Sequence, residues 1–444
     1  MCDKFLLPIR LTRVHLLVLL LLSSVELVAQ NEYVMPIVYV ETLGGVEPTC
    51  TPIKHSGYKG TTIISDYVRA RVVMVQGCDT LFSSPLADDT LGAKIKIRGN
   101  TSARKSKKPY KVKLAKKADL LGCEPACKDK EWALLAGDFK EQLKTIVGLQ
   151  MNKILEMEFC PSWQFCRLSL NGEDKGVYLL VESVKVNTKC RLNVDESGFF
   201  AELDAYWWAK DYSIGDGIMR YVVKYPDEDD LTDKQKTYIE GVLNGFTASI
   251  PAGSYEDYID VKSFASWILG HDILGTYDSS GSNLFLVKED NTAQTKLKMG
   301  PLWDFSGICR VTEWANQHKW GQFIKPLFQS SNTAFFNAYS ELWRENRETY
   351  ESSIKEFLRQ FEQSDVASVL SSAYGKKDYD EAVNMVNEWF DWRFRWIDNN
   401  ISSLFYQRIV SRDDFWYDVS GRRYVEPKTN VLYVRENKKM LVKP

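Results

Sequence analysis

The first 180 residues contain short segments in which apolar and polar side chains alternate. Residues 93–98 alternate isoleucine with lysine, and residues 110–114 (YKVKL) repeat the pattern. A period of two is typical of a strand with one buried face. Asn171-Gly172 is a strong hairpin signal between two further apolar runs. The same reading predicts strands over residues 34–42, 67–75, 165–170 and 177–181.

From about residue 183 the apolar positions mostly recur at helical spacing. One earlier segment, residues 142–157, shares that spacing and predicts a helix packed on the strands. A short hairpin is expected within the helical part, with strands at 284–288 and 297–299 around the polar turn DNTAQT. The later helices are predicted over residues 232–248, 261–276, 334–361 and 379–404.

These patterns predict an α+β protein in three parts. A β-rich lobe over about residues 31–182 precedes a helical lobe over about residues 183–404. The segment 405–444 predicts a small β-rich tail. This order matches the outline of a two-lobed kinase fold, although other α+β proteins share it.

The N-terminus has the features of a secretory signal peptide over residues 1–30. Basic residues precede the apolar run 16–22, and small and polar residues follow it. That run is too short to cross a bilayer, and no later stretch predicts a transmembrane segment. We therefore expect a secreted, periplasmic or cell-surface protein.

The composition of the chain limits the kinds of partner and metal that we expect it to bind. The formal net charge is −2, which argues against nucleic acid as a main partner, since phosphate backbones call for a basic surplus. Of nine cysteines, Cys2 leaves with the signal peptide, and the even remainder permits disulfides. The local pairs Cys123–Cys127 and Cys160–Cys166 are the first expected. Zinc is not expected, because no histidine lies at ligand spacing to a cysteine pair.

Three oxygen-bearing side chains have the spacing of a phosphoryl-transfer site. Asp278 is followed five residues later by Asn283, then by the predicted hairpin, then by Asp304 in GPLWDFSG. Kinases arrange a catalytic Asp, a metal-binding Asn and a metal-binding Asp in this order. A hairpin returns its ends to within about 5–10 Å, so Asn283 and Asp304 can share a cation. Taken singly, each residue also fits a turn or a strand cap.

The sequence identifies the positively charged residues that would bind the phosphates less clearly. Lys111 and Lys113 share one face of a strand, and either could bind phosphate; Arg98 ends the neighbouring strand. Glu141 and Glu156 flank the first helix as possible partners for the lysine. The chain contains no GxGxxG loop, and lysines on an alternating strand also fit a plain solvated face.

Five ordered motifs resemble the CotH family of spore-coat-type secreted kinases, from about residue 34 to about residue 404. They are IKIRGNTS, KKPYKVKL, LNGEDKGVYLLVES, KYPDEDDLTDKQ and KMGPLWDFSG. The Trp-rich last helix resembles the closing helix of the family. The tail resembles the YDLSGRR-type segment of secreted bacterial proteins, which implies possible cell-surface association.

The resemblance implies an atypical protein kinase that uses ATP and Mg²⁺ to phosphorylate Ser or Thr of extracytoplasmic proteins. By position Asp278 would be the catalytic Asp and Asp304 a metal ligand. Glu182 would lie between the lobes near the adenine. The nucleotide lysine stays open among Lys108, Lys111 and Lys113.

Two departures from the family pattern bear on activity. The family usually reads Trp-Asp-Phe-Asp, whereas Ser306 follows Phe305 here, and Lys144 stands where an Arg is usual. The expected function is therefore an exported protein kinase acting on secreted or cell-envelope proteins. The alternatives are a surface adhesion or scaffold protein that keeps the fold without catalysis, and an enzyme that transfers another group, such as AMP, from the nucleotide.

Overall fold

The computed structural model describes most of the chain beyond residue 32. The described ranges are 33–55, 60–85, 92–123, 126–217, 219–278, 282–315 and 323–410, together with the tail strands 416–418, 423–424, 432–435 and 438–441. The predicted signal peptide lies outside the described residues.

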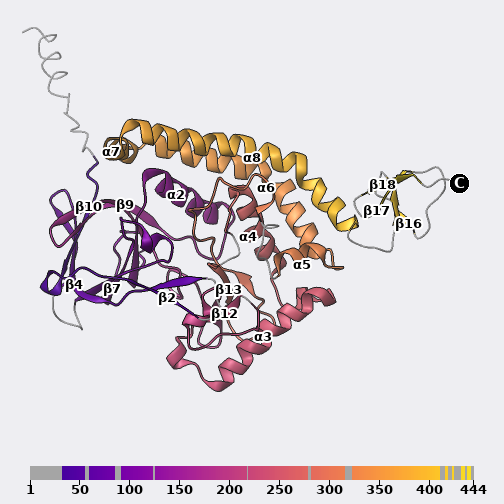
Figure 1. The fold of residues 1–444 in the computed structure, drawn as a ribbon, viewed down its shortest axis with the longest axis horizontal. Coiled ribbons are helices and arrows are strands. Elements are labelled where there is room, and N and C mark those ends of the chain that lie inside the picture. The colour runs from indigo at the N-terminus through magenta and orange to yellow at the C-terminus, as the bar shows by residue number, and fades with distance from the viewer. Residues whose placement is uncertain are drawn as a thin grey trace, which may run out of the picture. The chain divides into compact units, whose positions relative to one another are not determined.

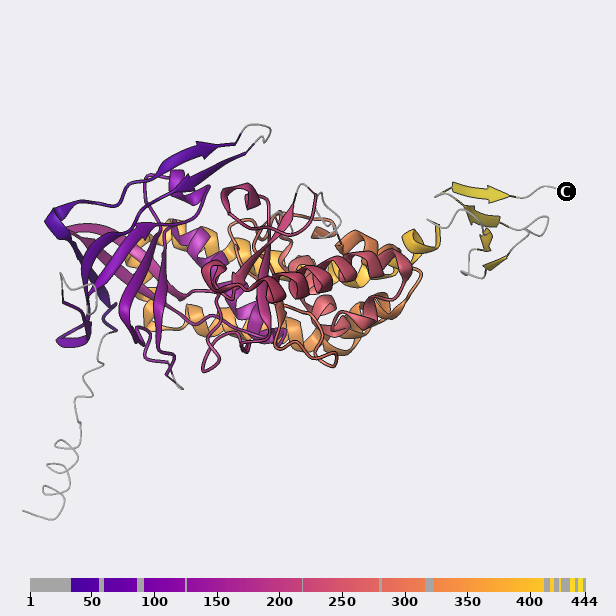
Figure 2. The same ribbon diagram turned by 90° about the horizontal axis from the view of Figure 1, so that it is seen from below.

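The strands of the first half close into a barrel (Figures 1 and 2). The sheet order is β1-β9-β10-β8-β7-β6-β4, and β4 also pairs with β1, which completes the ring; β5 extends β4. The bounds are β1 Ile37–Thr42, β4 Val68–Gln76, β5 Asp79–Ser83, β6 Ala93–Ile97, β7 Tyr110–Ala118, β8 Asp129–Leu135, β9 Trp163–Leu170 and β10 Glu173–Glu182. A separate hairpin comprises β2 Thr51–Lys54 and β3 Thr61–Ile64.

Alternation explains the barrel walls. In β6 and β7 the isoleucine, valine, tyrosine and leucine positions are buried and the lysines point outward. The inward set forms one apolar core with residues of β1, β4, β8, β9 and β10. The predicted hairpin turn is confirmed, with Asn171 and Gly172 both at positive φ, as a type I′ turn requires. The closure of the ring was not predicted.

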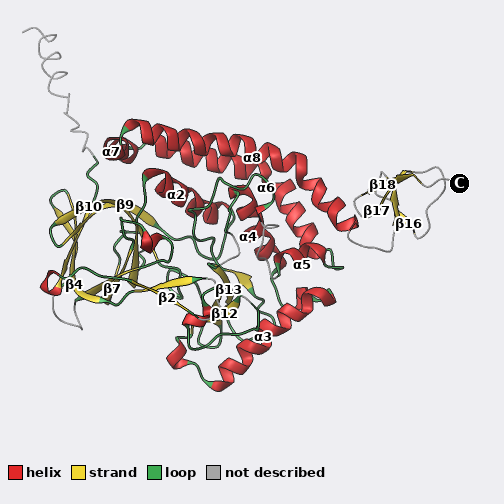
Figure 3. Cartoon of the chain, in the orientation of Figure 1, coloured by secondary structure: helices red, strands yellow, loops and turns green. Residues whose placement is uncertain are grey.

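The second half combines helices with a second sheet (Figure 3). The predicted hairpin is confirmed as β13 Leu284–Lys288 with β14 Lys298–Met299, but it is half of a four-stranded sheet in the order β12-β11-β13-β14. The strands β11 Phe199–Asp204 and β12 Arg220–Tyr225 were not predicted. In β11 the side chains of both faces are mostly buried, so the sequence shows no alternation there.

The predicted helices are confirmed, with shifted ends and two additions, α5 and α7. The long helices α6 and α8 run side by side (Figure 1). The bounds are α2 Phe139–Ile154, α3 Asp233–Ala252, α4 Val261–Leu274, α5 Ile324–Gln329, α6 Ala334–Glu362, α7 Asp365–Tyr374 and α8 Lys376–Val410. None of the helices within the described ranges is long and apolar enough to cross a bilayer.

Helix α2 connects the barrel to the helices. The buried Gln142 side chain donates to the Val177 carbonyl of β10 at 3.0 Å and accepts from the Tyr374 hydroxyl of α7 at 2.7 Å. At the start of α2, the ring of Phe139 stacks on Tyr379 of α8, with centroids 4.6 Å apart. Since β-rich and helical parts share this helix, its position is fixed from both sides.

The tail forms a small antiparallel sheet in the order β16-β15-β17-β18. Its strands are β15 Trp416–Asp418, β16 Arg423–Tyr424, β17 Leu432–Arg435 and β18 Lys438–Leu441.

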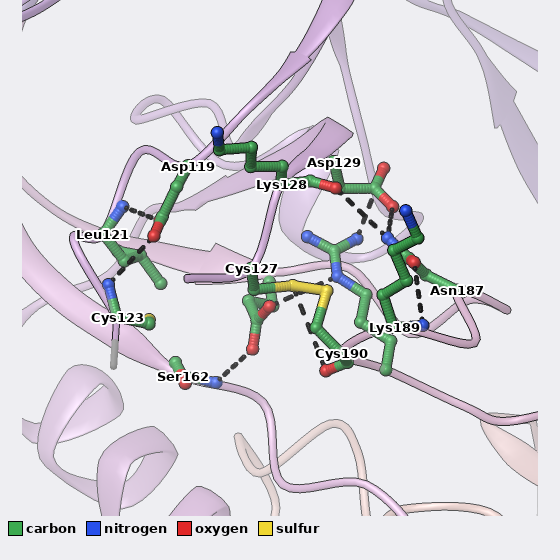
Figure 4. Close-up of a disulfide and its surroundings, with 12 residues drawn as sticks. Asp119, Leu121, Cys123, Cys127, Lys128, Asp129, Ser162, Asn187, Lys189 and Cys190 are labelled. Carbon is green, nitrogen blue, oxygen red and sulfur yellow. Dashed lines mark hydrogen bonds and ion pairs between the residues drawn. A yellow bond between two sulfur atoms is a disulfide. The ribbon is translucent and has the colours of Figure 1, made fainter. Parts of the chain in front are cut away.

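The disulfide differs from the expected local pairs. Cys127 bonds to Cys190, 63 residues away, with the Cα atoms 5.3 Å apart (Figure 4). Cys123, Cys160 and Cys166 are free thiols, so the predictions Cys123–Cys127 and Cys160–Cys166 are wrong. Cys166 points into the barrel core from β9, where it is fully buried. The bond ties the segment before β8 to the segment after β10.

Replacing Cys190 by Ser should lower the free energy of unfolding by about 2–5 kcal/mol, because the bond closes a long loop and restricts the unfolded chain. Urea unfolding under non-reducing conditions measures this. The matched control is Cys78→Ser, at an exposed free thiol, which should change little. Peptide mapping of the unreduced protein that recovers Cys123 bonded to Cys127 would contradict the observed pairing.

Candidate functional site

Asn283 and Asp304 lie together, as the hairpin spacing predicts. Asn283 directly precedes β13, and Asp304 follows β14, which pairs with β13 in the register Leu286 opposite Met299. The Asn283 side-chain amide lies 3.4 Å from the Asp304 carboxylate, Nδ2 to Oδ2. Asp304 is exposed and Asn283 is half-buried, so an amide and a carboxylate oxygen are available to one ligand.

Both residues have a left-handed backbone. The φ of Asn283 is 60° and that of Asp304 is 63°, a region that costs energy for residues other than glycine and that Asn and Asp tolerate best. The Asn283 amide N–H donates to Glu202 Oε1 of β11 at 3.0 Å, which holds this conformation. Such strained positions concentrate at functional sites.

Asp278 lies beside Asp304. Gly275 ends α4 at a φ of 58°, and the chain then runs alongside the segment after Asp304. The Tyr277 N–H donates to the Gly307 carbonyl at 3.0 Å, and the Cys309 N–H donates to the Leu274 carbonyl at 2.8 Å. Partial burial raises the pKa of Asp278, and the negative charge of Asp304 raises it further. The three predicted residues therefore share one site.

Helix α2 positions the segment that carries Asp304. The fully buried Asn152 side chain accepts from the Leu302 N–H at 2.7 Å and donates to the Leu302 carbonyl at 3.1 Å. Four residues earlier on α2, Gly148 leaves space for the Phe305 ring: a Cβ on Gly148 would lie 2.0 Å from a ring carbon. Asp304 is thus held between two points fixed to α2.

Ser306 occupies the position of the carboxylate that the family pattern usually places there. Its hydroxyl lies 3.2 Å from Asp304 Oδ1 and donates to it. The charge is lost, but Asp304 keeps a hydrogen-bond donor that orients its carboxylate.

Arg98 directly follows β6 and is a barrel cation that interacts electrostatically with Asp304. Its guanidinium lies 5.9 Å from the centre of the Trp303 ring. Burial lowers the pKa of Arg98, while the charge of Asp304 acts in the opposite direction. This cation therefore faces the site.

The lysines of β7 have a carboxylate partner that was not predicted. Glu131 of β8 pairs with Lys111 at 2.6 Å and with Lys113 at 3.3 Å. Burial lowers the pKa of Lys111, and the positive charge of Arg98 lowers it further, whereas the carboxylate of Glu131 raises it. The effect of Arg98 shows that its guanidinium lies near Lys111.

Neither glutamate proposed on the helix pairs with these lysines. Glu141 pairs with Lys105, and Glu156 lies just past α2. The strand DKEWALL shows no regular alternation, so the sequence carried no clear signal for Glu131.

Glu182 ends β10 inside a buried network. One carboxylate oxygen accepts from the Ser162 N–H at 2.9 Å, and the other accepts from Arg191 Nε at 3.3 Å. Burial raises the pKa of Glu182, and those hydrogen bonds oppose the rise. A carboxylate oxygen of Glu182 and the two disulfide sulfurs lie within 4.8 Å of one another. The sulfurs are bonded to each other and are therefore unavailable to a metal (Figure 4).

The comparison with protein families identifies a kinase-like protein. A family model described as "CotH kinase protein" matches residues 95–399, more than half of the chain. The protein belongs to the CotH kinase family. A search of curated proteins finds no match.

Replacing Gly148 by Ala should destabilise the protein, because the new methyl group would overlap the Phe305 ring. Overpacking typically costs about 1–3 kcal/mol, which exceeds the gain of up to about 1 kcal/mol from helix propensity. The control is Gly241→Ala in α3, where a Cβ meets nothing within 4 Å and stability should rise. Urea unfolding compares the two. Equal effects would show that α2 does not fix Phe305.

Proposed function

We propose that the protein is an exported, ATP- and Mg²⁺-dependent protein kinase that phosphorylates Ser or Thr of secreted or cell-envelope proteins. The observation that carries this proposal is the convergence of Asn283 and Asp304 beside Asp278. Family membership supports the same reaction class.

The donor set fits a magnesium ion. Mg²⁺ prefers oxygen ligands and usually takes one or two from protein, with water and phosphate completing its shell. Asn283 and Asp304 would supply them. Bound there, Mg²⁺ neutralises charge on the phosphates of the nucleotide. The carboxylates of Asp278 and Asp304 repel each other. A cation bound near both would relieve that repulsion, which supports a metal ion at this position.

The barrel would supply the remaining positive charge. Lys111, oriented by Glu131, and Arg98 are the proposed phosphate-binding residues, and Lys113 shares the same carboxylate. In a two-lobed kinase arrangement, barrel and helical part would close on the nucleotide from opposite sides. Glu182 would act there by fixing the segment that leaves β10, because both of its oxygens are already hydrogen-bonded.

Asp278 would orient the acceptor hydroxyl and accept its proton. Phosphoryl transfer has a loose transition state, so positioning contributes more than strong basicity. A carboxylate with a raised pKa is a better proton acceptor than an ordinary one.

Export is supported by two features of different kinds. Residues 1–30 have the pattern of a signal peptide. The Cys127–Cys190 disulfide is of a type that persists mainly in oxidising compartments. The tail, with its YDLSGRR-like sequence, is proposed to associate with the cell surface.

A second candidate is a surface adhesion or scaffold protein that keeps the kinase fold without catalysis. Ser306 favours it, because one of the usual carboxylates is absent next to Asp304. The lack of a Gly-rich phosphate loop in the sequence points the same way.

Asp304→Ala should abolish Mg-ATP binding while the protein stays folded, because it removes a proposed metal ligand. In a thermal-shift titration, wild type should gain about 2.7 kcal/mol at 100 times the dissociation constant, and the variant nothing. Labelled-phosphate transfer to a protein acceptor should disappear in parallel. Mass spectrometry of the acceptor distinguishes phosphate from AMP. No shift of wild type at millimolar Mg-ATP would favour the scaffold.

Asp278→Asn should reduce transfer about 10²-fold or more through loss of the proton acceptor, with Mg-ATP binding retained. At pH 7 its melting temperature should equal or exceed that of wild type. The raised pKa means that folding disfavours the ionised carboxylate, so stability falls as pH rises through that pKa.

The difference between Asp278→Asn and wild type should close below the ordinary aspartate pKa of 3.8, where both folded and unfolded wild type are protonated. Melting curves across pH measure this. Full transfer activity of Asp278→Asn would contradict the catalytic role proposed for Asp278.

A further inference from the structure

Tyr277 exposes an aromatic ring directly before Asp278. The side chain is 44% exposed, and past Leu81 it is the only large apolar side chain among the described residues that is exposed to this degree. Single exposed apolar side chains are common on protein surfaces, so exposure alone does not indicate a function. The location of Tyr277 does, because it adjoins the residue proposed to orient the acceptor hydroxyl, and the proposed reaction gives its ring no role.

Arg310 lies against that ring. Its guanidinium is 4.1 Å from the centre of the Tyr277 ring, within the range of a cation–π contact. Arg310 is exposed, and no ion pair to it occurs within the described ranges. Arginine contacts rings through its flat face and anions through the N–H groups at its edge, so the two interactions are compatible. The Tyr277–Arg310 pair therefore keeps donors for an anionic ligand.

Backbone hydrogen bonds fix the two positions relative to each other. The Arg310 N–H donates to the Gly275 carbonyl at 3.2 Å, and the Tyr277 N–H donates to the Gly307 carbonyl at 3.0 Å. Cys309, directly before Arg310, has a φ of 54°, in the left-handed region. This turn brings the segment that contains Arg310 back alongside the end of α4.

Helix α8 supports the end of α4 from the opposite direction in the sequence. The Trp389 indole N–H donates to the Ile273 carbonyl at 3.2 Å. A Cβ on Gly275 would lie 2.2 Å from the Trp389 ring, so the close approach requires glycine there. The Tyr277–Arg310 pair is thus carried by backbone that packed helices hold in place, which lowers the entropy lost when it binds a partner.

The charge of Arg310 is separate from the charges proposed for the nucleotide. Arg98 and Lys111 come from the barrel, whereas Arg310 lies in the segment after β14. An acceptor chain with its hydroxyl at Asp278 would run past the Tyr277–Arg310 pair within a few residues, because an extended chain advances at most about 3.3–3.6 Å per residue.

We propose that the Tyr277–Arg310 pair selects acceptor proteins that carry an acidic side chain within about three residues of the phosphorylated Ser or Thr. Arginine binds a carboxylate through two parallel hydrogen bonds, which makes the contact strong and directional. The inference rests on the proposed function, because it takes the acceptor hydroxyl to lie at Asp278. A phosphoserine left by an earlier transfer presents the same chemistry as a glutamate.

Charge reversal at Arg310 tests the selection. The probes are synthetic peptides with one central Ser and a Glu, a phosphoserine or a Lys at one flanking position. With Mg-ATP, wild type should prefer Glu to Lys at the favoured position by at least about tenfold in kcat/KM, the range for a hydrogen bond to a charged group. Arg310→Glu should reverse the preference, and Arg310→Lys should keep part of it. The change should appear in KM with kcat retained, since the contact does not involve the reacting atoms.

Two further sets of variants control for the substitution itself. Arg344→Glu makes the same charge change at an exposed position of α6 and should keep the wild-type preference. Tyr277→Leu should weaken the preference because it removes the ring, whereas Tyr277→Phe should keep it. Melting curves show that each variant is folded.

Fluorescence anisotropy of the labelled peptides without nucleotide separates docking from transfer. Binding of Glu peptides that Arg310→Glu loses, in a wild type that transfers no phosphate, supports the docking pair and contradicts the proposed function. A preference for phosphoserine over Glu that Arg310→Glu also loses supports the pair and assigns the anion to an earlier phosphorylation.

If wild type phosphorylates Glu and Lys peptides equally at every position, or if Arg310→Glu keeps the wild-type preference, the inference is overturned and the proposed function stands. If wild type neither binds nor phosphorylates any of the peptides, both fail.

Discussion

The packing of α2 is the constraint on which the rest of the structure depends. Gln142 joins this helix to β10 and α7, Asn152 holds both backbone groups of Leu302, and Gly148 admits the Phe305 ring. The close approach at Gly148 is possible only without a Cβ. Because Asp304 lies between Leu302 and Phe305, the helix that joins barrel and helices also sets the position of the acidic site.

Charge is distributed around that helix in two opposite ways. On the barrel wall, Glu131 pairs with two lysines, so the cations of β7 are partly compensated. At the end of the hairpin, by contrast, the carboxylates of Asp278 and Asp304 lie close enough to repel each other. Paired charges orient side chains, whereas two neighbouring carboxylates favour a cationic ligand that would neutralise both.

Local patterns were sufficient for much of the fold. Alternation in β6 and β7 and the Asn171-Gly172 turn identified barrel strands, since each depends on neighbours in sequence. The same patterns missed β11, which is buried on both faces, and the closure of the barrel, which depends on β1 pairing with both β4 and β9. The cysteine pairs failed for a similar reason: proximity in sequence favoured Cys123–Cys127, and the fold brings Cys190 to Cys127 instead.

The sequence by itself determined the order Asp278, Asn283, Asp304 and the hairpin that returns the last to the second, because a hairpin is a local structure with a short reach. It also determined the lysine face of β7 through its period of two. Only the tertiary structure decided that Glu131 is the partner of those lysines and that Gly148 and Asn152 support Asp304. Each of these depends on contacts between segments far apart in the chain, which no local pattern encodes.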